Sequence, residues 1–93
     1  MIYEWDETKS RQTYADRGFD FAHAVRVFAD PCRLERIDRR HDYGEERRQT
    51  IGEVDGKTFF VVFTRRGEAV RIISARRAHD HEDEAYREGE TWH

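Results

Sequence analysis

Arginine is concentrated in the second half of the chain, where apolar and polar residues alternate as they do in β-strands. The chain has 17 basic residues, and only Lys9 and Lys57 are lysine. A guanidinium group presents a planar fork of donors that suits phosphate oxygens, so this region predicts a surface that binds phosphodiesters. The alternative is that these arginines only protect an edge strand from aggregation, which would give the same composition. The arginines concerned are Arg47, Arg48, Arg65, Arg66, Arg71, Arg76 and Arg77.

The alternation of side chains along a strand limits how many of these arginines can meet. Arg71 is predicted to share a face with Ile73 and Ala75, whereas Ser74 and Arg76 share the opposite face. Arg71 and Arg76 therefore lie apart unless a β-bulge intervenes.

Proton transfer needs a further group near these arginines. Glu45 and Glu46 beside Arg47 predict either a general base next to a phosphate-binding site or a solvated turn with local ion pairs. The histidines show no i, i+4 pair that would let two imidazoles bind one ion, so neither a metal site nor a cofactor is predicted. They are His23, His41, His79, His81 and His93.

Length and composition favour one folded domain over residues 1–93, since a chain of this size cannot build two stable cores. Residues 33–77 hold twelve basic and eight acidic groups, net +4, whereas residues 78–93 hold one and six, net −5. No stretch approaches the roughly 20 apolar residues that span a bilayer, so no membrane association is predicted. Cys32 is the single cysteine, which fits a reducing cytoplasm.

The first third of the chain predicts a strand and two helices. Ile2 to Trp5 is a strand candidate, and Asp6 is placed to cap a helix from Glu7 to Arg17 that Gly18 ends. Apolar residues with helical spacing from Phe21 to Phe28 predict a second helix, and Asp30-Pro31 stops it.

The rest of the chain predicts four strands, at residues 33–37, 47–54, 57–64 and 69–75, and a C-terminal helix at residues 79–90. Asp55-Gly56 predicts a type I′ hairpin between the second and third of these strands. Because helices and strands are segregated, the fold class predicted is α+β, a mainly antiparallel sheet with two N-terminal helices and one C-terminal helix.

Several short motifs occur along the chain in an order that is typical of one family. The chain resembles the BrnT toxins from Trp5 to about Tyr86, most specifically over residues 71–78. The motifs are Trp5-Asp6-Glu7-Thr8-Lys9, the segment 17–24, Val27-Phe28-Ala29-Asp30-Pro31, Gly44-Glu45-Glu46-Arg47, Thr64-Arg65-Arg66-Gly67 and Arg71-Ile72-Ile73-Ser74-Ala75-Arg76-Arg77-Ala78.

This resemblance implies a RelE-like ribonuclease fold and a toxin that cleaves RNA. It also implies a BrnA-type antitoxin with a ribbon-helix-helix domain as partner, and a complex that represses its own operon by binding operator DNA. The rival hypothesis is a non-catalytic binding module that acts only within such a repressor complex.

The resemblance also selects the site residues. We expect Arg71, Arg66 and Arg76 to bind the phosphate, Lys9 to stabilise charge or transfer a proton, and Glu45 to act as base. With these five, Arg47 completes the predicted catalytic set. The predicted RNA-binding residues are Arg48, Thr64, Arg65, Ser74 and Arg77.

The chain departs from the family at the end of the first predicted helix. The family commonly has Lys-His-Gly there, whereas Asp16 and Arg17 precede Gly18 in this chain. Arg17 therefore stands where the family has a histidine. If that histidine serves as acid or base in the family, this protein is a weak nuclease or uses another group in its place.

Overall fold

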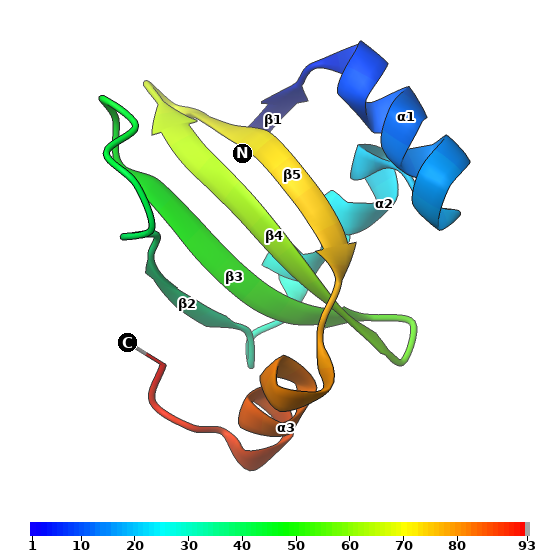
Figure 1. The fold of residues 1–93 in the computed structure, drawn as a ribbon, viewed down its shortest axis with the longest axis vertical. Coiled ribbons are helices and arrows are strands. Elements are labelled where there is room, and N and C mark those ends of the chain that lie inside the picture. Colours follow the sequence, from blue (N-terminus) through cyan, green and yellow to red (C-terminus); the bar gives the residue numbers. More distant parts are fainter. Residues whose placement is uncertain (93) are drawn as a thin grey trace.

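The computed structural model describes residues 1–92 of the chain. Within that range a sheet with strand order β1-β5-β4-β3-β2 carries helices on both faces. In Figure 1, α2 and η1 lie behind the sheet and α3 lies at its lower end. The elements are β1 (Ile2–Trp5), α1 (Glu7–Arg17), α2 (Phe21–Ala24), the 3-10 helix η1 (Val25–Ala29), β2 (Leu34–Ile37), β3 (Arg47–Val54), β4 (Lys57–Arg66), β5 (Ala69–Arg77) and α3 (Asp80–Glu88).

The sheet is mixed, because β1 pairs in parallel with β5 while the other neighbouring strands are antiparallel. The predicted fold class, a mainly antiparallel RelE-like sheet with two N-terminal helices, was therefore wrong. Alternation of apolar residues predicts a strand but not its partner. β1 docks on β5 because Tyr3 and Trp5 pack against the core that β5 helps to build. Within residues 1–92, no helix is both long and apolar enough to cross a membrane.

The second predicted helix is also different in the structure. It consists of a single α-helical turn, α2, followed by the tighter turn η1. The carboxylate of Asp20 caps α2 by accepting a hydrogen bond from the backbone amide of His23 at 2.9 Å. A 3-10 turn is common where a helix ends, and Asp30-Pro31 prevents this one from continuing.

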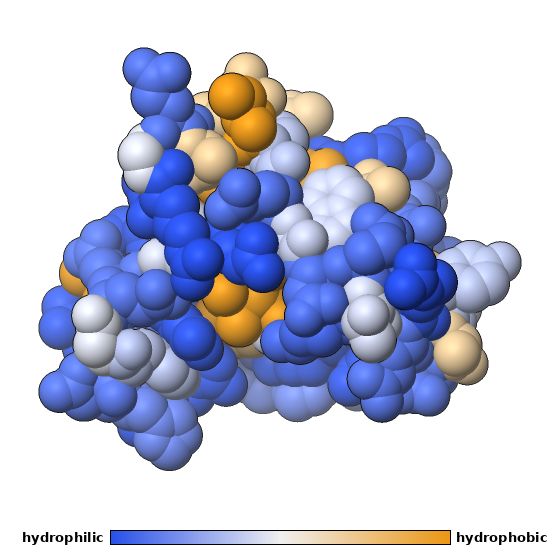
Figure 2. Space-filling view, turned by 90° about the horizontal axis from the view of Figure 1, so that it is seen from above, coloured by the Kyte–Doolittle hydropathy of each residue, from blue (hydrophilic) through white to orange (hydrophobic). Residues whose placement is uncertain are grey.

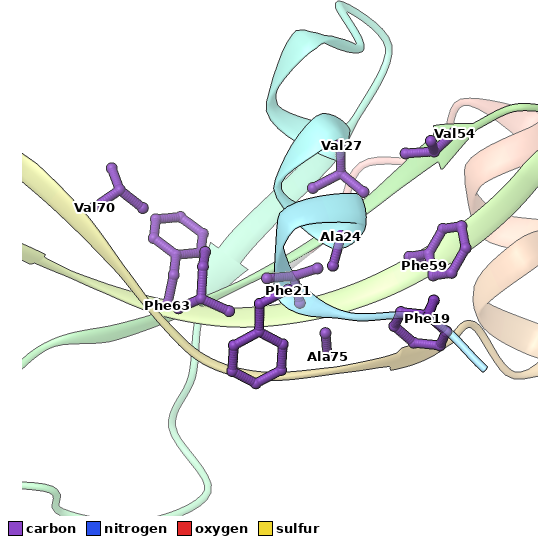
Figure 3. Close-up of a cluster of buried hydrophobic side chains, with 11 residues drawn as sticks. Phe19, Phe21, Ala24, Val27, Val54, Phe59, Phe63, Val70 and Ala75 are labelled. Carbon is purple, nitrogen blue, oxygen red and sulfur yellow. The ribbon is translucent and has the colours of Figure 1, made fainter. Parts of the chain in front are cut away.

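The main core lies between the sheet and the helices α2 and η1. Phe59, Val61 and Phe63 of β4 point into it, and we call their side of the sheet the helix-covered face. Figure 3 shows Phe21, Ala24 and Val27 from α2 and η1 over this face. Each of these three side chains is at most 1% exposed. Burying one such aromatic or aliphatic side chain contributes roughly 1.5–3 kcal/mol.

A smaller core lies on the opposite side of the sheet. Phe60, Val62 and Thr64 of β4 alternate with the residues of the main core, and we call their side the arginine face. Tyr86 of α3 and Trp92 pack against the Phe60 end of this face. Thr64 lies four residues further along β4, so the two ends of the arginine face differ in what covers them.

Asp30 joins three parts of the fold. Its carboxylate accepts hydrogen bonds from the backbone amides of Cys32 and Glu53, both at 2.8 Å, and from the hydroxyl of Tyr86 at 2.5 Å. These bonds link the end of η1 to β3 and α3. The Asp30-Pro31 pair therefore both ends a helix and holds the C-terminal helix in place.

Gly52 of β3 lies against η1 with no room for a side chain. A Cβ built there would be 2.8 Å from the Cβ of Val27 and 3.1 Å from its carbonyl oxygen. We expect Gly52→Ala to lower the free energy of unfolding by about 2 kcal/mol, because β3 and η1 must separate. Urea denaturation measures the change.

The control for this substitution is the same change in a Val27→Gly background, where the nearest clashing atom is gone. In that background Gly52→Ala should lower the free energy of unfolding clearly less than it does in the parent. A Gly52→Ala variant at least as stable as the parent would contradict the close packing of β3 on η1.

Candidate functional site

A row of polar side chains crosses the arginine face. Arg47 on β3 is the register partner of Thr64 on β4, and Thr64 is the partner of Arg71 on β5. Directly opposite residues project to the same face with Cβ atoms about 4.5–5.5 Å apart. We call Arg47, Thr64 and Arg71 the arginine row. The start of β3, the end of β4 and the start of β5, which carry the row, lie toward the upper end of the sheet in Figure 1. The surface at that end is mainly hydrophilic (Figure 2).

A β-bulge in β5 places Arg76 on the same face as the row. The register passes from Phe63↔Ile72 to Val62↔Ser74, so Ile73 is the extra residue. Strict alternation predicted Arg71 and Arg76 on opposite faces, and the bulge reverses that. Ala75 consequently lies in the main core rather than with Arg71.

Glu45 lies between two arginines beside the row. Its carboxylate is 3.3 Å from Nε of Arg47 and 3.6 Å from Nη2 of Arg66. The guanidinium of Arg47 also stacks over the ring of Tyr43, 4.2 Å from its centroid. Four predicted catalytic residues, Glu45, Arg47, Arg66 and Arg71, are thus brought together by the ends of β3, β4 and β5.

The loop that carries Glu45 is organised by Asp38. This carboxylate has no exposed side-chain surface and accepts hydrogen bonds from the backbone and guanidinium of Arg40 and from the hydroxyl of Tyr43. Its own amide donates to the carbonyl of Arg47 at 2.8 Å. The bonds from Arg40 lower the pKa of Asp38 from 3.8 to about 2. Asp38 therefore holds the position from which Glu45 approaches the row.

Asp38 makes the stability of the protein depend on pH between about 4 and 2. A lowered pKa stabilises the folded state above the unfolded value near 4, and this stability is lost as pH falls toward 2. We expect Asp38→Asn to be about 1–2 kcal/mol less stable than the parent at pH 7, allowing for solvent around Arg40. The difference should shrink between pH 4 and 2 in denaturation measured across that range.

Asp42→Asn is the matched control, since Asp42 is exposed and its carboxylate accepts a bond only from the amide of Gly44 among the described residues. The other carboxyls with lowered pKa are common to both proteins and cancel in the comparison. A deficit of Asp38→Asn that stays constant down to pH 2 would contradict the role of its ionised form.

Lys9 reaches the sheet at the place where β1 ends. Asp6 caps α1 by accepting from the amides of Thr8 and Lys9, which puts Lys9 in the first turn. Its Nζ donates to the carbonyl of Ile73, the bulge residue, at 2.6 Å. The pairing of β1 stops at Trp5↔Ile72, so this ammonium lies at the free edge of β5 next to the exposed Ser74.

Arg76 is held by the C-terminal helix. Its guanidinium donates two hydrogen bonds to Glu82 of α3, at 2.7 and 3.0 Å, and stacks over Phe60. The side chain of Glu82 is only 7% exposed. Burial raises the pKa of Glu82, but the bonds from Arg76 and the His79 amide outweigh it and lower the pKa. In this structure Arg76 ties α3 to the sheet.

All three predicted RNA-binding arginines lie on the helix-covered face, away from the row. Arg48 is the partner of Phe63 and pairs with Glu35 at 2.5 Å. Arg65 is the partner of Val70, and Arg77 is the partner of Phe59. The structure therefore separates Arg48, Arg65 and Arg77 from Arg47, Arg66 and Arg76, because neighbours along a strand point to opposite faces.

The comparison with protein families decides the class of protein to which this site belongs. A family model described as the ribonuclease toxin BrnT of type II toxin–antitoxin systems matches residues 5–82. The chain belongs to the BrnT family. No curated protein matches it. Membership makes RNA the expected substrate class and an antitoxin the expected partner class.

The match to BrnT covers the arginine row, Glu45, Lys9 and both partners of the Arg76–Glu82 pair. Two polar residues of the arginine face were missed by the sequence analysis. Gln49 is 3% exposed, and its side-chain oxygen accepts from Nε of Arg36 at 2.7 Å. Arg36 also stacks over Trp92. Strand alternation places Gln49 on the same face as Arg47, so the sequence could have predicted it. The place of Arg36 on this face follows only from the pairing of β2 with β3.

Among the residues that the structure describes, one group in this BrnT chain has ligand types and spacing that fit a metal ion. Suitable atoms of His79, His81 and Glu82 lie within 4.8 Å of one another. Glu82 is already bonded to Arg76, so a metal would compete for it. His23 packs on Phe59 of the main core, and His41 packs edge-on against Tyr43. The last candidate, His93, lies outside the described residues.

Proposed function

We propose that residues 1–93 act in the cytoplasm as a single toxin domain, an endoribonuclease that needs no metal and that inhibits translation and growth by cleaving RNA. The observation that carries this proposal is the arginine row with Glu45 beside it. Positive donors held on a rigid sheet can stabilise the charge that develops on a phosphodiester. Membership of the BrnT family supports the reaction class.

The proposed reaction uses the 2′-hydroxyl of the RNA as nucleophile. Glu45 takes the proton of that hydroxyl, whose oxygen forms a bond to phosphorus while the bond from phosphorus to the 5′-oxygen breaks. The products are a 2′,3′-cyclic phosphate and a 5′-hydroxyl, and the ammonium of Lys9 supplies the proton to the departing oxygen. Arg71 and Arg66 bind the non-bridging oxygens as their charge rises.

The positions of Glu45 and Lys9 support these two roles. Glu45 lies at the β3 side of the arginine row, and Lys9 lies at the free edge of β5. Two strand spacings, about 10 Å, separate β3 from β5 across the sheet, and the bond to Ile73 places Lys9 two residues further along β5 than Arg71. A phosphate bound between Glu45 and Lys9 has a base on one side and an acid on the other, as a displacement in line requires.

The proposed partner is a BrnA-type antitoxin with a ribbon-helix-helix domain. Such an antitoxin would cover the arginine face, and the complex would repress its operon by binding operator DNA. The type II family supports an antitoxin partner in general. Co-expression of that antitoxin should restore the growth of cells that the free toxin arrests.

The decisive experiment incubates the purified free protein with RNA in the presence of a chelator. Fragments that end in a 2′,3′-cyclic phosphate support the proposed reaction. Cleavage only after a divalent metal is added would contradict independence from metal. Binding without cleavage under both conditions would favour the rival hypothesis of a non-catalytic module within a repressor complex.

A further inference from the structure

A second basic site lies on the helix-covered side of the sheet, away from the arginine row. It is a hollow of about 460 Å³ between the end of α1, the start of α2, the start of β4 and the end of β5. We call it the basic hollow. Its polar and charged lining consists of Tyr14, Arg17, Asp20, His23, Lys57 and Arg77, and Phe19 and Phe59 line its floor together with Gly18.

Three cations in the basic hollow lack a carboxylate partner. Among residues 1–92, no carboxylate oxygen lies within 4 Å of the charged nitrogens of Arg17, Lys57 or Arg77. The carboxylate of Asp20 is occupied as the cap of α2. By contrast, each arginine of the arginine row has a glutamate nearby. Three cations against one carboxylate therefore leave the hollow with a net positive charge.

Two donors of the hollow are fixed by the same core residue. Nε of Arg77 donates to the carbonyl of Thr58 at 3.2 Å, and its guanidinium lies 5.5 Å from the centroid of the Phe59 ring. The ring of His23 packs edge-on against Phe59 at 5.4 Å. Because Phe59 is buried, Arg77 and His23 are held in place before any ligand arrives. Such preorganisation lowers the entropic cost of binding.

The chemistry of the lining favours a nucleotide unit. Guanidinium and ammonium groups bind phosphate oxygens, and the ring of Tyr14, in a residue that is 61% exposed, offers a surface on which a base can stack. An acidic peptide would satisfy the charges but would leave this aromatic surface unused. We propose that the basic hollow binds a phosphate of single-stranded RNA outside the cleaved bond, with the adjoining base on Tyr14.

This inference rests on the ribonuclease function proposed above, and the topology connects the two sites. Arg76 and Arg77 are neighbours that point to opposite faces of β5, and within residues 1–92 the edge of β5 beyond Ile72 has no strand partner. From Arg71 to Arg77 the strand rises about 20 Å. A single strand of RNA that crosses this free edge can contact the arginine row and the hollow together.

Binding of a labelled single-stranded oligonucleotide tests the proposal. Its riboses are 2′-O-methylated, so the nucleophilic hydroxyl is absent and cleavage cannot interfere. We expect Arg17→Glu with Lys57→Glu to weaken binding by about tenfold or more, and to reduce the slope of log affinity against log salt by about 1.4. Arg11→Glu is the matched control, an exposed arginine on the same helix outside the hollow, and it should stay within about twofold of the parent.

The outcomes separate this inference from the proposed function. The proposal that the hollow binds RNA is overturned if the double variant keeps the affinity of the parent, or if Arg11→Glu reduces the affinity as much. Either result counts even if the parent cleaves RNA. Loss of affinity only in the double variant supports the hollow even if the parent cleaves nothing. An oligoglutamate peptide that binds the hollow more tightly than the oligonucleotide would identify a protein ligand and overturn the proposal.

Discussion

Arg71→Ala should remain folded and cleave RNA at least about 100-fold more slowly than the parent, and its expression should no longer arrest bacterial growth. One donor aimed at developing charge is worth about 3 kcal/mol in a transition state. Among residues 1–92, the one acidic partner of Arg71 is Glu4, in a loose pair at 3.8 Å. An ion pair of this kind contributes at most about 1 kcal/mol to stability. Activity and stability should therefore respond very differently to this one substitution.

Arg26→Ala is the matched control for Arg71→Ala. Arg26 is another arginine with an acidic partner, Asp55 at 3.1 Å, but it lies on η1 away from the arginine row. Initial rates on a labelled RNA and thermal melting of all three proteins provide the comparison. If Arg71→Ala melts like the parent and keeps full activity and toxicity, Arg71 is a surface charge and the site lies elsewhere.

Arg76→Ala should lower the free energy of unfolding by about 3 kcal/mol, in contrast to Arg71→Ala. The substitution removes the guanidinium and both of its hydrogen bonds from the nearly buried carboxylate of Glu82, and a buried charge without its counter-charge is strongly destabilising. It also removes the guanidinium that stacks over Phe60. Because this pair joins α3 to the sheet, we expect α3 to become exposed to hydrogen exchange.

A double-mutant cycle identifies the cause. Glu82→Ala removes the acid, and Arg76→Ala in that background should cost clearly less than about 3 kcal/mol, since no buried carboxylate remains unpaired. Equal costs in both backgrounds would mean that the stacking on Phe60, and not the ion pair, holds α3. The cycle is needed before any loss of cleavage by Arg76→Ala is assigned to chemistry, because unfolding alone could produce it.

Local features of the fold followed from the sequence because their causes lie within a few residues. Asp6 and Gly18 predicted the bounds of α1, which the structure confirms. Asp55-Gly56 predicted a type I′ hairpin, and both residues have positive φ, 51° and 80°. The short motifs predicted the family, which the match over residues 5–82 confirms.

Tertiary structure alone decided which side chains meet. The parallel partner of β1 and the bulge at Ile73 depend on contacts between segments far apart in the sequence, and the bulge brings Arg71 and Arg76 onto one face. The same register turned Arg77 toward the basic hollow. The sequence by itself determined that this is a BrnT chain rich in arginine. Where those arginines point depended on strand register, because a shift of one residue moves a side chain to the other face.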